Sequence, residues 1–129
     1  MRQTINFLII VALPLIFGCS DFGDKIAEGG NPADTVVYFS RDIQPIFNAN
    51  CSGCHVGGNQ GGLTLDSYAA LMQGGDSGPV VRAGFPDSSI LVKRIEGTIQ
   101  PRMPLGGQEL LPNDIQSIRR WILQGIHDN

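Results

Sequence analysis

The feature that most constrains this chain is the five-residue motif Cys51-Ser52-Gly53-Cys54-His55. Side chains three and four positions apart share one face of a helix, so Cys51, Cys54 and His55 are expected to project to the same side. Two thiols spaced in this way can form thioether bonds to one edge of a porphyrin, while the adjacent imidazole binds its iron. The motif therefore predicts one covalently bound haem c, with His55 as an axial ligand of the iron.

Two other interpretations of the motif remain open. A zinc site needs four ligands, and the only spare candidates in the sequence are Cys19 and His127. A thioredoxin-like redox pair would lie beside a strand-helix-strand unit, whereas the sequence shows almost no alternating strand pattern. Haem is the preferred interpretation because it uses all three side chains of the motif at once.

Met103, in the segment Gln100-Pro101-Arg102-Met103-Pro104, is predicted to be the second axial ligand. The flanking prolines fix φ and remove backbone donors, which gives a stiff loop able to hold a side chain across a pocket. A thioether is a soft ligand that favours reduced iron. The alternatives are Met72, which lies in an apolar helical stripe typical of a core, His127 near the end of the chain, and an iron with an open sixth site.

Three arginines are candidates to pair with a haem propionate, because a guanidinium matches a carboxylate with two parallel hydrogen bonds. They are Arg82, Arg94 and Arg102. Arg102 is the first choice because it directly precedes Met103. Trp121 is expected to be a core residue rather than an electron relay.

The first eighteen residues have the pattern of an export signal. Arg2 precedes an apolar stretch, residues 7–17, that is too short for the roughly 20 residues of a membrane-spanning helix. The stretch ends in Gly18-Cys19-Ser20, which resembles a bacterial lipobox, where cleavage precedes the cysteine and the cysteine is lipidated. An ordinary leader or an uncleaved anchor with an incidental cysteine is the alternative.

We therefore expect cleavage after residue 18, a lipid anchor on Cys19, and a location on the periplasmic face of a bacterial membrane. The outer membrane is favoured, because Ser20 stands where an aspartate commonly marks retention in the inner membrane. The expected partners are redox proteins and, through the anchor, a membrane. No small-molecule substrate is expected.

Composition limits both the size and the partners of the folded part. The chain has 9 basic and 12 acidic side chains and no basic run, which argues against binding to nucleic acid. Residues 19–35 are polar and rich in glycine, so we expect a flexible tether. Residues 36–129 form one predicted domain, and domains this small usually need a disulfide, a metal or a cofactor for stability.

Apolar residues at helical spacing predict an all-α domain of about four short helices with long glycine-rich loops. The first helix starts near Ser40 or Pro45 and runs into the cysteine motif. The second has Asp66 as its cap and ends at Gly74, and the third has Asp87 as its cap. The last begins at Pro112, presents Trp121 on its apolar face and ends at Gly125.

From Phe39 to Ile126 the chain resembles the small class I-like c-type cytochrome domains of planctomycete-type and related bacterial exported proteins. The resemblance implies thioether links at Cys51 and Cys54, with His55 and Met103 as axial ligands. It implies single-electron transfer without an enzymatic step; a haem sensor or an oxidoreductase subunit with an open sixth site is the alternative. The matching segments are Asp42 to Phe47, Cys51 to His55, Gly61-Gly62-Leu63, Ser89-Ile90-Leu91, Arg102-Met103-Pro104 and Ile115 to Gly125. Leu111-Pro112-Asn113 departs from the Ser or Thr cap that often precedes the last helix.

Overall fold

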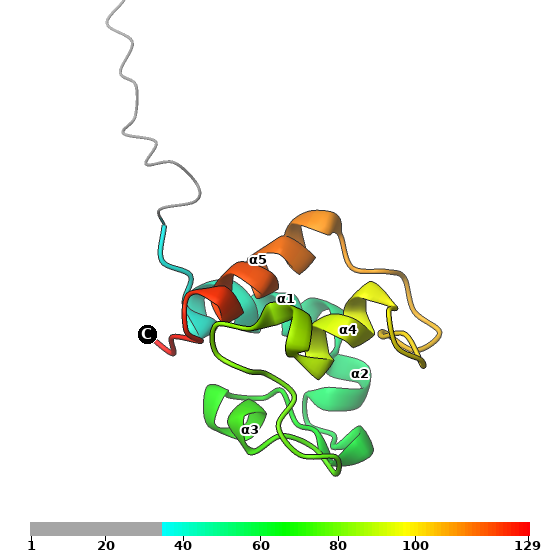
Figure 1. Cartoon of the computed structure of the whole chain (residues 1–129). Coiled ribbons are helices and arrows are strands. Elements are labelled where there is room, and N and C mark those ends of the chain that lie inside the picture. The colour runs from blue at the N-terminus through cyan, green and yellow to red at the C-terminus, as the bar shows by residue number, and fades with distance from the viewer. Residues whose placement is uncertain (1–34) are drawn as a thin grey trace, which may run out of the picture. The chain divides into compact units, whose positions relative to one another are not determined.

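The computed structural model describes residues 35–129, and its regular elements in this range are helices (Figure 1). One isolated bridge joins Gly75 and Gly78. The expected all-α class is thereby confirmed. Within residues 35–129, none of the helices combines the length and the apolar character that a membrane span requires. The predicted export signal, Cys19 and all of the predicted tether except Thr35 lie outside the described residues.

Five α-helices and three short helical turns follow one another along the described chain. The α-helices are α1 (Gln44–Asn50), α2 (Ser52–His55), α3 (Tyr68–Gln73), α4 (Ile90–Glu96) and α5 (Pro112–Leu123). The turns are a π-helical turn η1 (Phe39–Ile43) and two 3₁₀ turns, η2 (Gln60–Gly62) and η3 (Pro86–Ser88). The single helix expected before and through the cysteine motif is thus divided into η1, α1 and α2.

The start of the domain is fixed by Asp42 rather than by Ser40. The Tyr38 N–H donates to Asp42 Oδ2 over 2.8 Å, so this carboxylate satisfies a backbone donor at the start of η1. Regular α-helix begins only at Gln44, because Pro45 has no N–H and is tolerated only in the first turn of a helix. The segment expected to start near Ser40 or Pro45 thus begins with the irregular turn η1, and its regular α-helix begins one residue before Pro45.

The expected caps of the second and third helices are wrong by one and two residues. Ser67 caps α3, and its Oγ accepts from the Ala70 N–H over 3.2 Å. Asp66 instead accepts from the Gly57 N–H. Ser89 occupies the N-cap position of α4, while Asp87 forms an ion pair with Arg119 of α5. Both carboxylates bind partners outside the helix that follows them, Asp66 in the loop before it and Asp87 on α5, which helical periodicity does not reveal.

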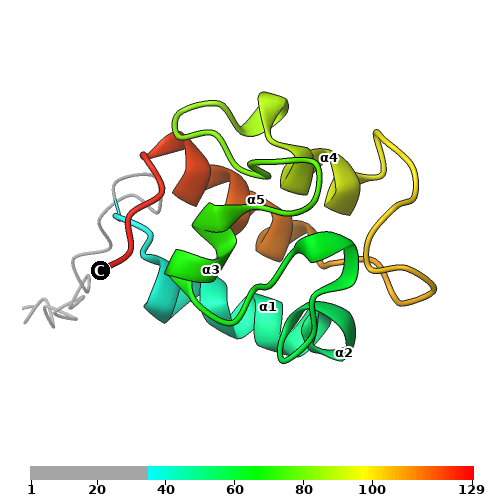
Figure 2. The same ribbon diagram turned by 90° about the horizontal axis from the view of Figure 1, so that it is seen from below.

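Helix α5 contacts elements from the start and from the middle of the described chain. It packs against η1 and against α4 (Figures 1 and 2). Its core-facing residues Ile118, Trp121 and Ile122 are completely buried. The Phe39 ring of η1 lies 5.7 Å from the Trp121 ring and 5.8 Å from the Tyr68 ring, measured between centroids. This aromatic contact explains why Trp121 is a core residue, as expected.

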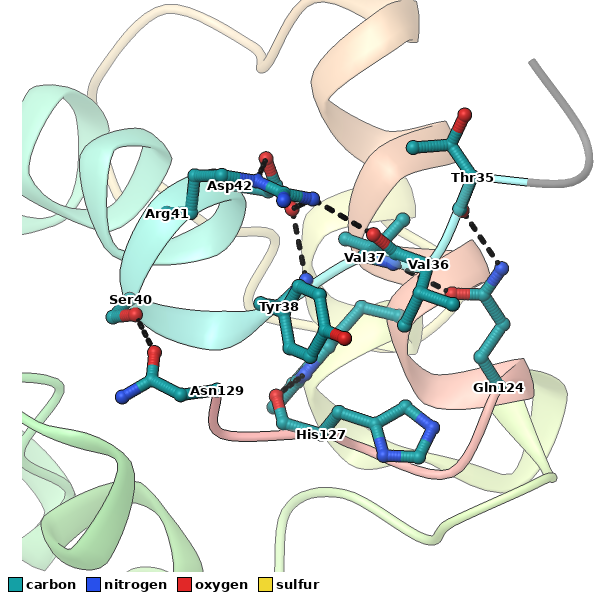
Figure 3. A network of polar contacts seen from close by, with 11 residues as sticks. Thr35, Val36, Val37, Tyr38, Ser40, Arg41, Asp42, Gln124, His127 and Asn129 are labelled. Carbon is teal, nitrogen blue, oxygen red and sulfur yellow. Dashed lines mark hydrogen bonds and ion pairs between the residues drawn. The ribbon is translucent and has the colours of Figure 1, made fainter. Parts of the chain in front are cut away.

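The first described residues and the C-terminal tail meet at one end of the domain (Figure 3). The His127 carbonyl accepts from the Phe39 N–H over 2.9 Å and from Trp121 Nε1 over 2.8 Å. Gln124 holds Val37 and Thr35 through its amide oxygen and nitrogen, respectively. Helix α2 and the loop after residue 100 lie at the other end in both ribbon views (Figures 1 and 2).

Candidate functional site

The cysteine motif folds as a tight helical turn around the carbonyl of Cys51. Cys51 ends α1 with φ −120° and ψ −5°, and it is also the N-cap of α2. The N–H groups of Cys54 and His55 both donate to Cys51 O, over 3.3 and 2.9 Å. The motif therefore keeps the helical spacing that its chemistry requires, although the helix before it is interrupted.

A backbone carbonyl sets the tautomer of His55. The imidazole Nδ1 lies 3.0 Å from Leu63 O. Because a carbonyl oxygen only accepts hydrogen bonds, Nδ1 must carry the proton in this contact, which leaves a lone pair on Nε2. A histidine that ligates a metal usually donates its other N–H to such a partner. The contact of His55 with Leu63 O is thus the kind that a metal-ligating histidine usually makes, and ligation by His55 stays a prediction.

The segment that supplies Leu63 O is held by close backbone contacts. Leu65 N–H donates to His55 O over 2.6 Å, and Asp76 N–H donates to Gly61 O over 2.9 Å. A Cβ atom on Gly75 would lie only 2.7 Å from Gly61 O, so glycine is needed for this approach. These contacts fix the loop that lies beside the imidazole.

Met103 is positioned by helix α4. Its N–H donates to Arg94 O over 3.0 Å, and Arg94 Nη1 donates to Pro101 O over 3.0 Å. Arg94 accepts one of these hydrogen bonds and donates the other, so it holds the loop on either side of Arg102. The Met103 side chain is half-buried and packs against the hydrophobic core.

Two adjoining cavities bring the predicted site residues together. The larger, of about 450 Å³, is lined by Cys51, Cys54, His55 and Met103, among others. The smaller, of about 220 Å³, extends inward between apolar side chains. Both cavities are lined by Cys51, His55, Gln60, Gly61 and Met103.

The two cysteines differ in exposure. Cys54 is exposed, whereas Cys51 is partly buried against the core. Burial raises the pKa of the Cys51 thiol to about 11, with a smaller contribution from neighbouring Cys54. Cys51 is therefore protonated and uncharged at neutral pH, which is compatible with the apolar wall that it forms.

Arg94, rather than Arg102, is the arginine at the cavities. It lines the inner cavity and is the only Lys or Arg among the residues lining either one. Arg102 lines neither: it pairs with Glu109 and its stem packs beside Gly97. Arg82 lies over the Phe85 ring. The pairing of Arg102 with a propionate stays a prediction, although the fold places Arg94 of α4, and not Arg102, at the inner cavity.

The alternative ligands lie elsewhere. Met72 is exposed on α3 and lines neither cavity, and His127 lies beside Tyr38 at the opposite end of the domain. Among residues 35–129, no cluster of three or more His, Cys, Asp or Glu side chains is arranged to hold a metal ion. The zinc interpretation therefore has no ligand set in this part of the chain.

The arrangement fits a covalently attached haem. Together the cavities lie within the roughly 300–1,000 Å³ that cofactor sites usually occupy. A Cβ on Gly53 would meet nothing within 4 Å, so the outer wall leaves open space for a ring edge. Thiols, an orientated imidazole and a thioether are the donors that c-type haem requires.

Residues 51–104 match the family model described as Planctomycete cytochrome C. The match supports a planctomycete-type cytochrome c domain over these residues. No curated protein and no solved structure matches the chain at a significant level. The match begins at the first cysteine of the motif and ends just after Met103. It therefore includes Cys51, His55 and Met103, which line both cavities. This cytochrome c domain implies covalently bound haem c and haem-based electron transfer.

Proposed function

We propose that the cytochrome c domain holds a single haem and carries single electrons, with His55 and Met103 as the two axial ligands. The observation that supports this most is that both side chains line the same two cavities as Cys51. Bound haem would supply a one-electron couple between ferrous and ferric iron.

Each site residue has a defined role in this proposal. Cys51 and Cys54 form the thioether bonds, and His55 offers Nε2 while Leu63 O holds its other nitrogen. Met103 offers its sulfur from a loop fixed to Arg94. Thioether ligation raises the reduction potential, and the apolar inner wall keeps water away from the metal. A propionate that enters the inner cavity would meet the Arg94 guanidinium.

We also propose that the domain works at a membrane surface. Its support is the lipobox-like Gly18-Cys19-Ser20 after the apolar leader. Cys19 would carry the lipid and residues 20–35 would form the tether, with the domain on the periplasmic face, preferably of the outer membrane. Its electron donors and acceptors would be other redox proteins. Mass spectrometry of the exported protein would contradict this if Cys19 were retained in an uncleaved, unlipidated chain.

Absorption spectroscopy of protein matured in an export-competent host tests the ligands. The ferric protein should show a thioether-to-iron charge-transfer band that Met103→Ala abolishes. Met72→Ala is the matched control and should keep the band, because Met72 lines neither cavity. Rapid binding of carbon monoxide to the unaltered ferrous protein would instead support a sensor or enzyme subunit with an open sixth site. Absence of covalent haem would overturn the proposal altogether.

A further inference from the structure

Two exposed apolar side chains belong to adjoining segments at the C-terminal end of α5. Leu123, in the last turn of this helix, is 62% exposed, and Phe85, in the segment before α4, is 58% exposed. The Gly84 N–H donates to Ile122 O over 2.7 Å, which joins the backbones next to these two residues. Figure 2 shows the segment before α4 beside the C-terminal end of α5. Apolar surface is therefore concentrated at this end of the domain.

The same turn of α5 holds the segment through which the chain enters the domain. Gln124, which follows Leu123, accepts from the Val37 N–H and donates to Thr35 O. Val36 lies between these two contacts and is 41% exposed. A third exposed apolar side chain thus lies beside the last turn of α5, directly next to the point of entry.

Arg82 adds a positive charge to this surface. Its guanidinium carbon lies 5.3 Å from the centroid of the Phe85 ring. Arg82 is exposed, and the ion pairs of residues 35–129 do not include it; Asp87 pairs with Arg119 instead. An arginine stacked on an aromatic ring can keep its charge in a polar layer while the ring enters an apolar one. We call four residues the entry patch: Val36, Arg82, Phe85 and Leu123.

The chain before Thr35 favours one occupant for the entry patch. Fifteen residues, 20–34, separate Thr35 from Cys19, the residue proposed to carry the lipid. The tether expected from the sequence would have an average span of about 20 Å, and fifteen residues reach at most about 50 Å. The anchor would therefore keep the bilayer close to the end of the domain that carries the entry patch. Tethering gives an effective concentration of roughly millimolar, so a few apolar side chains are enough for contact.

We propose that the entry patch is a docking surface for the phospholipid bilayer that holds the anchor. The inference rests on the proposed attachment at Cys19 and deepens it. Val36, Phe85 and Leu123 enter the boundary between head groups and acyl chains, as the apolar residues of interfacial helices do. Arg82 stays at the level of the phosphate groups, which a guanidinium binds with two hydrogen bonds. Because α2 lies at the other end of the domain, the cavities face away from the bilayer (Figures 1 and 2).

Nuclear magnetic resonance of the lipidated holoprotein tests the contact. The ferrous protein is incorporated into phosphatidylcholine nanodiscs in which some head groups carry a gadolinium chelate. Phosphatidylcholine has no net charge, so contact depends on apolar insertion and on single phosphate groups. Relaxation of methyl protons then reports their distance from the bilayer surface.

Leu111 is the matched reference within the same molecule. It is 63% exposed at the N-cap of α5, whereas Leu123 is 62% exposed in the last turn of that helix. The two positions lie about 18 Å apart along the helix axis. Because the relaxation enhancement falls with the sixth power of distance, it should be at least fivefold larger at Leu123 than at Leu111. Equal enhancement at the two leucines would overturn the docking surface.

Variants separate docking from mere attachment through the tether. Phe85→Asp opposes insertion and leaves the tether unchanged, so the enhancement at Leu123 should fall at least threefold. Arg82→Gln should lower it by a smaller factor. Leu111→Asp is the control and should leave the enhancement at Leu123 unaltered. An enhancement at Leu123 that Phe85→Asp does not change would show that the tether alone holds the domain near the bilayer, and would overturn the inference.

Two further measurements distinguish the ways in which the inference can fail. In an uncharged detergent, amide shifts of the entry patch that change with protein concentration would assign it to a second copy and overturn docking on lipid. Mass spectrometry of the nanodisc sample reports the lipid on Cys19 and the covalent haem. A missing lipid overturns the proposed attachment together with the docking surface, and a missing haem overturns the proposed electron carrier. A lipidated holoprotein without contact overturns the docking surface alone.

Discussion

Gly62 shows how single residues hold the wall of the haem site. It has φ +71°, and a Cβ there would lie 2.8 Å from the Asp76 backbone nitrogen. The neighbouring Gly61 carbonyl accepts from that same Asp76 N–H. Close approach of the Gly62 segment and the Asp76 segment thus depends on glycine. The Gly62 segment also supplies Leu63 O to His55. Backbone packing is therefore linked to the orientation of the predicted iron ligand.

Gly57 and Gly62 form a matched pair for testing this link. Both have φ +71°, but a Cβ on Gly57 would meet nothing within 4 Å. Gly57→Ala should cost about 1–2 kcal/mol from backbone strain alone. Gly62→Ala should cost roughly 1–3 kcal/mol more, because the Asp76 segment must move. Chemical unfolding of the two holoproteins measures the difference, and equal losses would show that the loops are not tightly packed here.

Much of the site could be predicted at the residue scale because its donors form local patterns. Cys51, Cys54 and His55 are a contiguous motif, and Met103 stands between prolines. No motif or helical pattern indicates Arg94 at the inner cavity, where α4 places it, or Leu63 O beside His55, which a loop eight residues further along the chain supplies.

At the scale of helices, apolar periodicity predicted which segments are helical but not where they start. Helix α5 begins at Pro112 as expected, because proline there is compatible with the first turn. Helices α3 and α4 have Ser67 and Ser89 at their N-caps, because Asp66 binds the Gly57 N–H and Asp87 pairs with Arg119. The break at Cys51 separates two helices where periodicity alone predicts one.

Asp42 makes the start of η1 sensitive to acid. Its pKa is held below the ordinary value by the hydrogen bond from Arg41 and, to a lesser extent, by the Tyr38 N–H. A depressed folded-state pKa means that the ionised carboxylate stabilises the fold above the ordinary pKa of about 4, and that this stability is lost as pH falls through the folded-state value.

Asp42→Asn should therefore destabilise the domain by roughly 0.2–1 kcal/mol at neutral pH, because the ion pair is exposed. The difference from the unaltered protein should shrink as pH falls through the lowered folded-state pKa of Asp42, and it should vanish once the carboxyl group is protonated in both the folded and the unfolded state. Denaturant unfolding at a series of pH values measures it. Asp114→Asn is the control. Asp114 also lies in the first turn of a helix, but it does not accept the Tyr38 N–H as Asp42 does. A difference that does not shrink as the pH is lowered would rule out this origin.

At the scale of the whole domain, the two ends of the described chain are joined on the side away from the haem site. Gln124 Oε1 accepts from the Val37 N–H over 2.8 Å, and Gln124 Nε2 donates to Thr35 O over 3.1 Å (Figure 3). Arg41 adds a hydrogen bond to Val36 O. The segment that enters the domain is thus fixed by side chains of α5 and η1, while the cavities are built from other elements.

Gln124→Ala should loosen this entry segment without changing the haem site. Protection of the Val37 amide against hydrogen exchange should fall at least tenfold, because its acceptor is removed. Gln124→Glu keeps an oxygen for that amide and should preserve most of the protection. Absorption spectra of both variants should match that of the unaltered protein. A spectral change as large as the loss of protection would mean that the two ends are coupled.

The two hydrogen bonds of Gln124 to Val37 and Thr35 also determine which contacts of the domain break first under mechanical tension. A pull on the N-terminal segment acts on Thr35 and Val37, whose hydrogen bonds converge on one side chain. Next in line is the η1 turn, held by the His127 carbonyl. The load reaches this end of the domain before α2 or Met103. A force applied through the N-terminal segment would thus disrupt the hydrogen bonds of Gln124 before it reached His55 or Met103.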